Sequence, residues 1–546
     1  MRRAMRRMRE CARRPDPAEA VANLEVGAAG ANSPAMQRTA TPFATARRQL
    51  LQIALAAGIA PAFARHAFAA DVERFELGIA SGHPTPSGMV LWTRLTGDDL
   101  PPRVDVHWEM AEDEAFRKVV ASGVEAAEAA WAHSVHAEPA DLAPGRWYWY
   151  RFRALGQRSP VGRTRTAPAA DAAAALQFAI ASCQRWDHGH FAAWRHMAAE
   201  ELDLVMFLGD YIYEYPYIPG RVRAHDGGFV TTLSQYRDRY AHYKRDPALQ
   251  AMHAAAPWLL VWDDHEVEND YAGLLGGERP DQDIAARRAA AYQAYWEHLP
   301  FPRAWRPRGA DMRIHSRWDW GTLARIHALD DRQYRDSQAC PKPNRAGSNT
   351  VSVKACPALL DPKRSLLGEA QERWLAEGWD LKRRWNLLAQ QTLMARFDWK
   401  DPALDPTWWT DGWDGYAPSR KRLLGTVRER AVPNVVVLGG DVHSHYVADL
   451  KADFDDPKSP VVASEFCGTS ISSLSMAQSR IDAALRFNPH VHYGRSDQRG
   501  YMRFSLAERE LKAQLRVVDD ALDPASGIRT AARFTVEAGR PGAQRG

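Results

Sequence analysis

Four apolar segments of the chain each run into side chains of types that bind metal ions. The segments span residues 176–182, 204–209, 259–262 and 435–440, and they are followed by Cys183, by Asp210, by Asp263-Asp264-His265, and by Asp441 and His443. In open α/β sheets, ligands bind just beyond the carboxyl ends of the strands. If these segments are neighbouring strands, a thiol, several carboxylates and two imidazoles meet at one edge. Because such carboxylates repel one another without cations, the sequence predicts a site for several metal ions.

The mixture of ligand types predicts two kinds of metal ion. Carboxylate oxygens suit hard ions such as calcium, magnesium or manganese. A thiolate, an imidazole and a phenolate suit a transition metal, with iron and zinc the leading candidates. Metal ions a few ångströms apart can hold the attacking and leaving oxygens of a phosphoryl transfer, and one of them generates hydroxide. The expected chemistry is therefore hydrolysis of a phosphoester by a metal-bound hydroxide.

The segments that must position these residues alternate between strand and helix. After an Ala-rich linker at 167–175, apolar residues recur with helical spacing at 192–202, 284–298 and 369–379. This alternation predicts an α/β domain that runs to about residue 540. Before the linker, short runs with period-two alternation, such as 89–93, 104–108 and 147–153, predict a small antiparallel β-sandwich. We expect that sandwich to be structural or to guide substrate.

The first 69 residues differ from the rest of the chain. Arg47 and Arg48 precede an apolar run at 50–64, which is shorter than the ~20 residues of a membrane-spanning helix. The run ends near Ala67-Phe68-Ala69, a pattern of the kind that signal peptidase cleaves. The arrangement resembles a twin-arginine export signal, although Ala46 replaces the usual Ser or Thr. We expect a leader at 1–69, export by the twin-arginine translocation machinery, and a protein in the periplasm or outside the cell with no stable membrane anchor after cleavage. The alternative is a basic tail before a buried helix.

Composition and charge exclude several classes of protein. The 546 residues are 45% hydrophobic and 25% charged, which excludes a largely disordered, collagenous or multi-span membrane protein. The formal net charge of +4 is small for this length, so we expect no nucleic-acid partner. Residues 1–69 contain 11 of the 71 basic and 4 of the 67 acidic residues, and the remaining 60 and 63 give the mature chain a charge near −3. The positive net charge of the full chain therefore comes from the leader.

Short motifs at these and neighbouring positions follow one another in a recognisable order. They are Phe75-Glu76-Leu77-Gly78-Ile79-Ala80-Ser81-Gly82, Leu91-Trp92-Thr93-Arg94, Ser182-Cys183-Gln184, Gly209-Asp210-Tyr211-Ile212-Tyr213-Glu214, Trp262-Asp263-Asp264-His265-Glu266, Arg332-Gln333-Tyr334-Arg335, Leu367-Gly368-Glu369, Gly439-Gly440-Asp441-Val442-His443-Ser444-His445 and Gly468-Thr469-Ser470-Ile471-Ser472-Ser473. The set resembles the PhoD-like alkaline phosphatases of the metallophosphoesterase superfamily and covers nearly all of residues 71–510.

The resemblance implies a secreted phosphomonoesterase or phosphodiesterase that uses one Fe³⁺ and two Ca²⁺ ions. The implied fold is an α/β metallophosphoesterase-like sandwich, two β-sheets flanked by helices, preceded by a small all-β sandwich domain. The corresponding domains are the leader at 1–69, the β-sandwich at 70–168 and the catalytic domain at 169–546.

The resemblance also implies roles for individual residues. Cys183 and Tyr213 bind iron, Asp210 bridges iron and calcium, and His443 completes the iron ligands. Asp441 binds calcium, and either Asp264 or Asn269 is a further calcium ligand. His265 contacts the phosphate or protonates the leaving group. Tyr211 competes with Tyr213 for the phenolate role, and His445 either supports a ligand or binds substrate. Asp331 stands where the family more often has Thr, a departure outside the core site.

Several of these residues also have simpler interpretations. Asp263 could cap a following helix, His265 could merely orient a carboxylate, and we interpret His188 and His190 as loop residues near the mouth of the site. Cys340 and Cys356 either form a disulfide that closes a surface loop or remain free, and Cys467 is expected to be packed in the core. Two other functions fit the chain as a whole: a phospholipase D-type phosphodiesterase acting on phospholipids, and a non-catalytic secreted binding protein.

Overall fold

The computed structural model describes residues 73–278 and 283–546. The predicted leader, including Arg47, Arg48 and the apolar run at 50–64, lies outside the described residues. Within the described ranges, no helix is both long and apolar enough to cross a membrane.

Three of the four predicted strands lie side by side in a ten-stranded sheet. Its order is β24 (Arg540–Arg545), β23 (Ile528–Glu537), β22 (Glu510–Val518), β21 (Gly500–Leu506), β9 (Leu176–Ala181), β10 (Leu204–Leu208), β11 (Trp258–Val261), β1 (Ile79–Thr85), β2 (Gly88–Arg94) and β5 (Ser134–Ala137). β9, β10 and β11 are parallel neighbours, so their carboxyl ends meet at one edge. Almost all of their residues are buried, as expected for parallel strands covered on both faces.

The fourth predicted strand lies in a separate seven-stranded sheet. Its order is β12 (Ser316–Trp320), β13 (Ala324–Ala328), β15 (Trp385–Ala389), β17 (Val435–Gly439), β19 (Val461–Cys467), β18 (His445–Lys451) and β20 (Val491–Arg495). Successive residues of β17 point to opposite faces. Val436 and Leu438 join the core that contains β9 to β11, whereas Val435 and Val437 join a second core on the other side.

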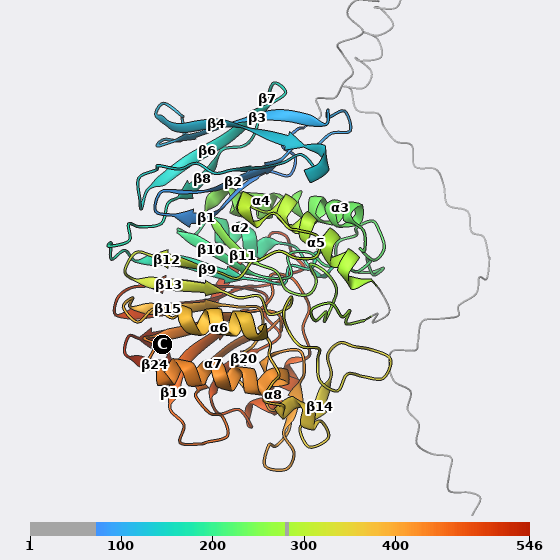
Figure 1. Cartoon of the computed structure of the whole chain (residues 1–546), viewed down its shortest axis with the longest axis vertical. Coiled ribbons are helices and arrows are strands. Elements are labelled where there is room, and N and C mark those ends of the chain that lie inside the picture. The colour runs from blue at the N-terminus through green and yellow to red at the C-terminus, as the bar shows by residue number, and fades with distance from the viewer. Residues whose placement is uncertain (1–72, 279–282) are drawn as a thin grey trace, which may run out of the picture. The chain divides into compact units, whose positions relative to one another are not determined.

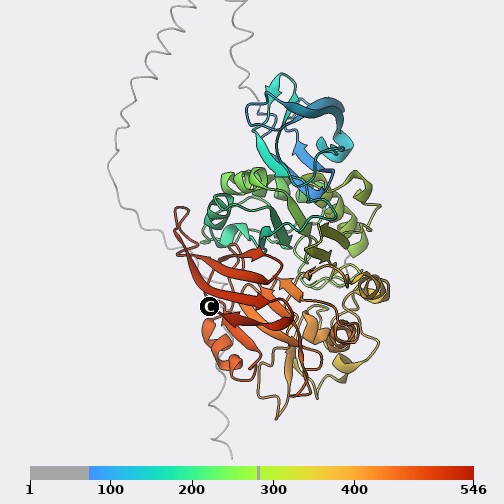
Figure 2. The same ribbon diagram turned by 90° about the vertical axis from the view of Figure 1, so that its left-hand side faces the viewer.

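Helices cover the outer faces of both sheets (Figure 1). On the ten-stranded sheet they are α2 (Ala192–Ala198), α3 (Leu233–Lys244), α4 (Pro247–Ala255) and α5 (Ile284–His298), and on the seven-stranded sheet α6 (Gly368–Gly378), α7 (Ala417–Glu429) and α8 (Gln478–Leu485). The three predicted helices are present, with α2 ending at Ala198 rather than at residue 202. Figure 2 shows the layers after a quarter turn, with the C-terminal strands in red.

The strands predicted near the N-terminal end pack as two sheets, one of which continues into the ten-stranded sheet. A five-stranded sheet holds β4 (Val119–Glu128), β3 (Arg103–Ala111), β6 (Trp147–Ala154), β7 (Gln157–Arg158) and β8 (Gly162–Arg165). Its apolar face packs against β1, β2 and β5 in a core of its own. β1 is joined to β11 through Gly82, which faces Trp258. A Cβ at Gly82 would lie 2.8 Å from the Trp258 carbonyl oxygen, so this junction requires glycine.

A disulfide bond between Cys340 and Cys356 closes a loop of the chain, which confirms the bonded one of the two alternatives. The loop contributes β14 (Thr350–Ser352), which pairs with β16 (Thr407–Trp409) in a two-stranded sheet. Cys467 is fully buried with its Sγ 3.2 Å from the Gly440 carbonyl oxygen, as expected for a packed cysteine.

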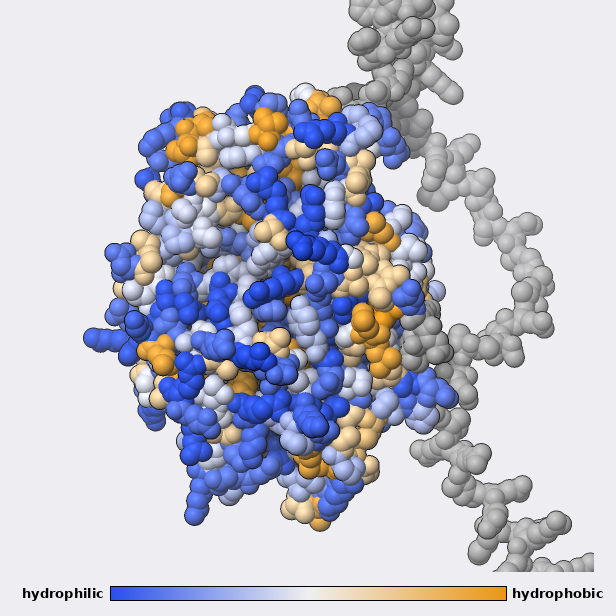
Figure 3. Space-filling model, viewed as in Figure 1, coloured by the Kyte–Doolittle hydropathy of each residue, from blue (hydrophilic) through white to orange (hydrophobic). Residues whose placement is uncertain are grey.

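The face of the molecule in Figure 3 is mostly hydrophilic, with apolar side chains scattered over it.

Candidate metal centre

The predicted ligands meet where the two sheets adjoin. Cys183, Asp210 and the run 263–265 follow β9, β10 and β11 of the ten-stranded sheet, whereas Asp441 and His443 follow β17 of the seven-stranded sheet. The site therefore differs from the expected edge of one open sheet. Apolar runs identify strands buried on both faces but do not say which sheet each strand joins, because both sheets bury their strands in the same way.

Left-handed backbone turns aim these side chains into the site. Cys183, Asp210, Asp441 and His443 have φ angles of 60°, 60°, 63° and 51°. Residues other than glycine rarely adopt this region, and where they do the surrounding structure must hold them there. Gly209, also left-handed at φ 104°, brings β10 close to β11, since a Cβ there would lie 2.4 Å from the Cβ of Asp263. The four turns place side chains from separate strands within reach of one another.

The first cluster joins the residues expected to bind iron. The ligand atoms of Cys183, Asp210 and His443 all lie within 4.8 Å of one another. The Tyr213 hydroxyl lies 2.7 Å from Asp210 Oδ2 and 3.1 Å from His443 Nε2. The Tyr211 hydroxyl instead lies 2.7 Å from His253 Nε2. The geometry therefore favours Tyr213 over Tyr211 as the phenolate donor.

Carboxylates extend this cluster toward the residues expected to bind calcium. Asp210 also groups with Asp264 and His265, and Asp264 groups with Asp263 and Asp441, each set within 4.8 Å. Asn269 and Asp264 both line the adjoining cavity, so the structure does not choose between them as calcium ligand. A chain of donors thus runs from Cys183 through Asp210 and Asp264 to Asp441.

The donor set fits bound metal ions. Among the described residues, one buried carboxylate oxygen on each of Asp210, Asp263 and Asp441 has no hydrogen-bond partner. Burial, followed by neighbouring carboxylates, raises the pKa of the Cys183 thiol well above its usual value. Burial raises the pKa of Asp441 too, and the nearby Asp264 adds to it. Bound cations would offset the cost of burying the unpaired carboxylate oxygens and the cost of ionising the buried Cys183 and Asp441 side chains. The mixed sulfur, nitrogen and oxygen donors suit a transition metal beside hard ions.

Two contacts orient the histidines. His265 Nδ1 lies 2.7 Å from a Glu214 carboxylate oxygen, and the other Glu214 oxygen accepts a hydrogen bond from the Asn269 backbone N–H. Burial alone would lower the pKa of His265, but Glu214, Asp210 and Asp264 together raise it well above its usual value. His443 Nδ1 lies 2.7 Å from the Leu474 carbonyl oxygen, which leaves Nε2 toward Asp210 and Tyr213. Such partners fix the ring position and tautomer of ligating histidines.

Glu266 ties the strand ends together. Its carboxylate accepts hydrogen bonds from the backbone N–H groups of Asp210, Tyr211 and Asp263. Burial, with the nearby Asp210 carboxylate, raises the pKa of Glu266 to about 8. Glu214 and Glu266 stand inside the recognised motifs, but sequence reasoning gave them no role because their partners come from different strands.

Arg332 supplies a buried positive charge that sequence reasoning missed. Its guanidinium contacts Asp263, lies 3.8 Å from Asp264 and donates to Asp411 at 2.8 Å. The interpretation of Asp263 as a helix cap is wrong, because no described helix begins at that position and its carboxylate pairs with Arg332 instead. Arg332 begins one of the recognised motifs, but it stands 69 residues after Asp263 in the chain, so no local pattern predicts the contact.

The remaining candidates are not members of the donor clusters. His445 is fully buried, accepts a hydrogen bond from the Thr469 backbone N–H, and has a pKa lowered by burial to about 3. It does not line the cavity beside the metal donors. His188 accepts from the Leu474 N–H, next to the carbonyl that holds His443, while the His190 backbone bonds Ala521. Asp331 bonds Gln391 and also stays outside the cavity.

A cavity of about 490 Å³ opens onto the donor chain. Asp210, Asp264, His265, Asp441 and His443 are among the polar residues of its lining, and Arg345 and Arg480 line it too. A volume of this size is typical of a site for a small molecule. Chemically, the arrangement can hold several cations beside a space that accepts a small anionic ester.

Known structures show which class of protein shares this arrangement. Purple acid phosphatase PPD1 from yellow lupin seeds superposes with a TM-score of 0.52 at 10% sequence identity, covering 85% of this chain and 74% of that one, and shows the fold alone. A solved structure of PhoD superposes with a TM-score of 0.81 at 41% identity, covering 86% of this chain and 92% of that one. The fold is metallophosphoesterase-like, as the motifs implied.

Sequence comparison narrows the class to a family. The model of the PhoD-like phosphatase family matches residues 178–515, and that of its N-terminal domain matches residues 59–168. Alkaline phosphatase D of Bacillus subtilis (strain 168) is 42% identical over 487 residues, which cover 86% of this chain and 82% of the relative. The chain belongs to the PhoD-like phosphatase family and is a hydrolase, as the motifs predicted.

Proposed function

We propose that the protein is an exported alkaline phosphatase that hydrolyses phosphate monoesters and diesters with one Fe³⁺ and two Ca²⁺ ions. The observation that carries the proposal is the convergence of the buried Cys183, Asp210 and Tyr213 with the half-buried His443 in one cluster. Thiolate, imidazole and phenolate donors suit a transition metal such as iron, and the adjoining carboxylates suit a hard ion such as calcium. The name of the B. subtilis relative, alkaline phosphatase D, supports the same activity.

In this proposal each donor has the role that the family motifs imply. Cys183, Tyr213 and His443 would hold iron, Asp210 would bridge to calcium, and Asp441 with Asp264 or Asn269 would complete the calcium sites. Bound metal ions would supply positive charge to the phosphoryl oxygens and lower the pKa of the attacking water.

His265 is placed to handle the proton of the leaving group. Glu214 holds Nδ1, so Nε2 is the ring nitrogen that remains for substrate, and His265 lines the cavity. Burial lowers the pKa of this imidazole, whereas the Glu214 carboxylate, which is not a proposed metal ligand, raises it and favours the protonated form. A protonated imidazole at that position can donate to the departing ester oxygen.

Export is the second part of the proposal. The order of Arg47-Arg48, apolar run and Ala67-Phe68-Ala69 supports passage through the twin-arginine machinery into the periplasm or the medium. The Cys340–Cys356 disulfide supports an oxidising compartment, because cytosolic thiols are kept reduced.

Metal content and ester hydrolysis test the enzymatic proposal together. Purified mature protein should contain iron and calcium, absorb visible light through phenolate-to-iron charge transfer, and release phosphate from monoesters. In Cys183→Ala, iron content, absorption and activity should all fall at least tenfold, because the thiolate ligand is gone. Cys467→Ala is the matched control, since Cys467 is the other buried free cysteine among the described residues, and it should keep all three. Full activity in a Cys183→Ala protein that retains its iron would contradict the proposal.

A further inference from the structure

Aromatic side chains form one part of the cavity lining beside the metal donors. Phe397, Trp399, Trp409 and Tyr446, here called the aromatic wall, all line the same cavity as Asp210, Asp264 and His443. The Phe397 ring lies 4.9 Å from Trp399 and 5.3 Å from Tyr446, both edge to face. Phe397 and Tyr446 are buried, whereas Trp399 and Trp409 keep part of their surface exposed.

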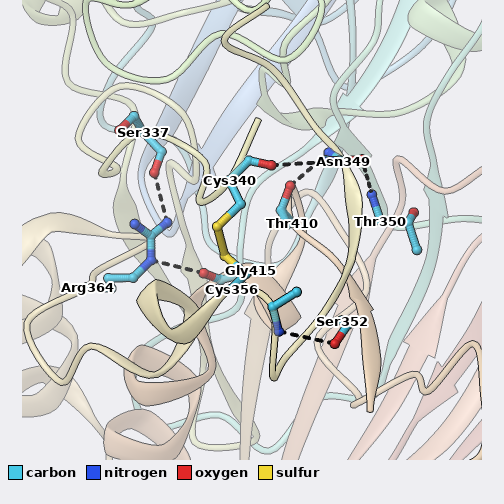
Figure 4. The surroundings of a disulfide bond; sticks show 10 residues. Ser337, Cys340, Asn349, Thr350, Ser352, Cys356, Arg364, Thr410 and Gly415 are labelled. Atoms are coloured by element: carbon cyan, nitrogen blue, oxygen red, sulfur yellow. Dashed lines mark hydrogen bonds between the residues drawn. A yellow bond between two sulfur atoms is a disulfide. The ribbon is translucent and has the colours of Figure 1, made fainter. Parts of the chain in front are cut away.

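The segment closed by the Cys340–Cys356 disulfide pairs with the strand that carries Trp409 of the aromatic wall. Thr350 of β14 pairs with Trp409 of β16, and both line the cavity. Asn349 and Thr410 exchange hydrogen bonds beside that pair, and the Asn349 amide also bonds the Cys340 carbonyl oxygen (Figure 4). The Trp409 ring lies against Gly412, where a Cβ would come within 3.2 Å of it. Trp409 is therefore fixed by its strand, by the disulfide-closed loop and by a close glycine.

The chemistry of the two linings differs in a way that suits a two-part ligand. The donor part is acidic and suits a phosphoryl group only through cations, whereas the aromatic wall presents ring faces and edges. The Arg480 guanidinium lies 5.6 Å from the Trp399 ring, so the wall is also close to a positive charge. Tryptophan rings bind planar unsaturated groups by stacking, and they do so with little dependence on the identity of the ring.

We propose that the aromatic wall binds a planar ring on the alcohol part of the substrate, so that the enzyme prefers phosphoesters of nucleosides and similar ring-bearing alcohols. This inference rests on the proposed phosphoester hydrolysis at the metal donors and adds the class of substrate. The cavity, at about 490 Å³, is of the size that encloses one small molecule. Trp399 and Trp409 act as specificity-determining residues, since their exposed surface is what a ring would cover.

Two esters with the same kind of leaving group test the inference. Thymidine 5′-phosphate and glycerol 3-phosphate both release a primary alcohol, so their chemical steps are matched and only the ring differs. In the mature, metal-loaded enzyme, Trp399→Ala and Trp409→Ala should each lower kcat/KM for thymidine 5′-phosphate about tenfold, mainly by raising KM. The same variants should change kcat/KM for glycerol 3-phosphate by less than about twofold, because glycerol offers no ring to stack.

Two controls separate stacking from loss of structure. Trp399→Phe keeps a ring and should restore most of the preference. Trp147→Ala removes another partly exposed tryptophan with an arginine over its ring, Arg163 at 3.7 Å, but in the five-stranded sheet and outside the cavity, and it should leave both esters unaffected.

The outcomes distinguish this inference from the function on which it rests. Equal losses on both esters, or no loss on thymidine 5′-phosphate, would overturn the role of the wall while phosphoester hydrolysis stands. If the wild-type enzyme hydrolyses neither ester, the proposed function fails. Calorimetric binding of thymidine 5′-phosphate to the same variants then decides the role of the wall by itself, with weaker binding in both Trp→Ala variants as the supporting result.

Discussion

Glu214 shows how much of the site depends on residues that hold other residues. It is fully buried, and each of its carboxylate oxygens accepts one hydrogen bond, from His265 Nδ1 and from the Asn269 backbone. A glutamine has one acceptor oxygen and one amide group that only donates. In Glu214→Gln, one of the two donors must therefore face another donor.

We expect Glu214→Gln to lower kcat about 10- to 100-fold, because His265 loses its fixed position. Steady-state kinetics on a phosphate monoester would measure the loss, with circular dichroism to show that the fold is intact. Glu297→Gln is the matched control, since Glu297 is equally buried but pairs with Arg237 and does not line the cavity. A Glu214→Gln enzyme as active as that control would show that His265 needs no such support.

At the scale of single residues, the sequence predicted the metal-donor residues better than the residues that contact them. Cys183, Asp210 and Asp441 were predictable because each lies two residues after the end of an apolar strand of recognisable pattern. Arg332 and Ser473 were not assigned, although Arg332 contacts the acids and the Ser473 hydroxyl lies 2.8 Å from that of Tyr213. Both sit on loops far along the chain from their partners, and no local periodicity encodes such contacts.

At the scale of elements, the loop closed by Cys340 and Cys356 links folding to the cavity. It carries Arg345, Ser348 and Thr350, all of which line the cavity, and it holds β14 against β16. A disulfide that closes a loop of about 15 residues stabilises a protein by about 3 kcal/mol through the entropy of the open chain. Removal of the disulfide should therefore destabilise the backbone of that loop first.

We expect the double variant Cys340→Ser/Cys356→Ser to exchange backbone amides in residues 341–355 about a hundredfold faster than the wild type, the equivalent of about 3 kcal/mol. Hydrogen exchange with mass spectrometry would resolve this segment, and peptides from β17 in the same sample serve as the internal reference. Unchanged exchange in the loop would mean that its other hydrogen bonds suffice to hold it.

Elements were predicted more fully than their arrangement. Continuous apolar runs located β9, β10, β11 and β17, and helical spacing located α5 and α6. That β17 belongs to a second sheet, and that β1 extends the first one through Gly82, depends on pairing between distant segments. The close approach at Gly82 reflects packing in three dimensions, which a single glycine in the sequence does not reveal.

Over the whole molecule, the donor chain joins the two sheets. Cys183 and Asp210 extend from the ten-stranded sheet, and Asp441 and His443 extend from the seven-stranded sheet. The buried Arg332 offsets Asp263 and Asp264, and it shares Asp411 with the buried Arg335. Without bound metal ions, the excess of buried carboxylates would repel across the junction between the sheets.

Removal of metal ions should therefore lower the stability of the entire fold and not only its activity. A ligand present at a hundred times its Kd stabilises the folded state by about 2.7 kcal/mol, so chelation should lower Tm by about 5 °C at the sensitivity typical of larger domains. Differential scanning calorimetry of the mature protein before and after dialysis against a chelator would measure the change, with recovery on adding iron and calcium back. Cys183→Ala supplies the comparison: with its transition-metal site already lost, its Tm should start lower and fall less on chelation. If chelation abolishes activity in the wild type but leaves Tm unchanged, the metal ions act on substrate alone, and the contacts between the sheets hold the molecule together without them.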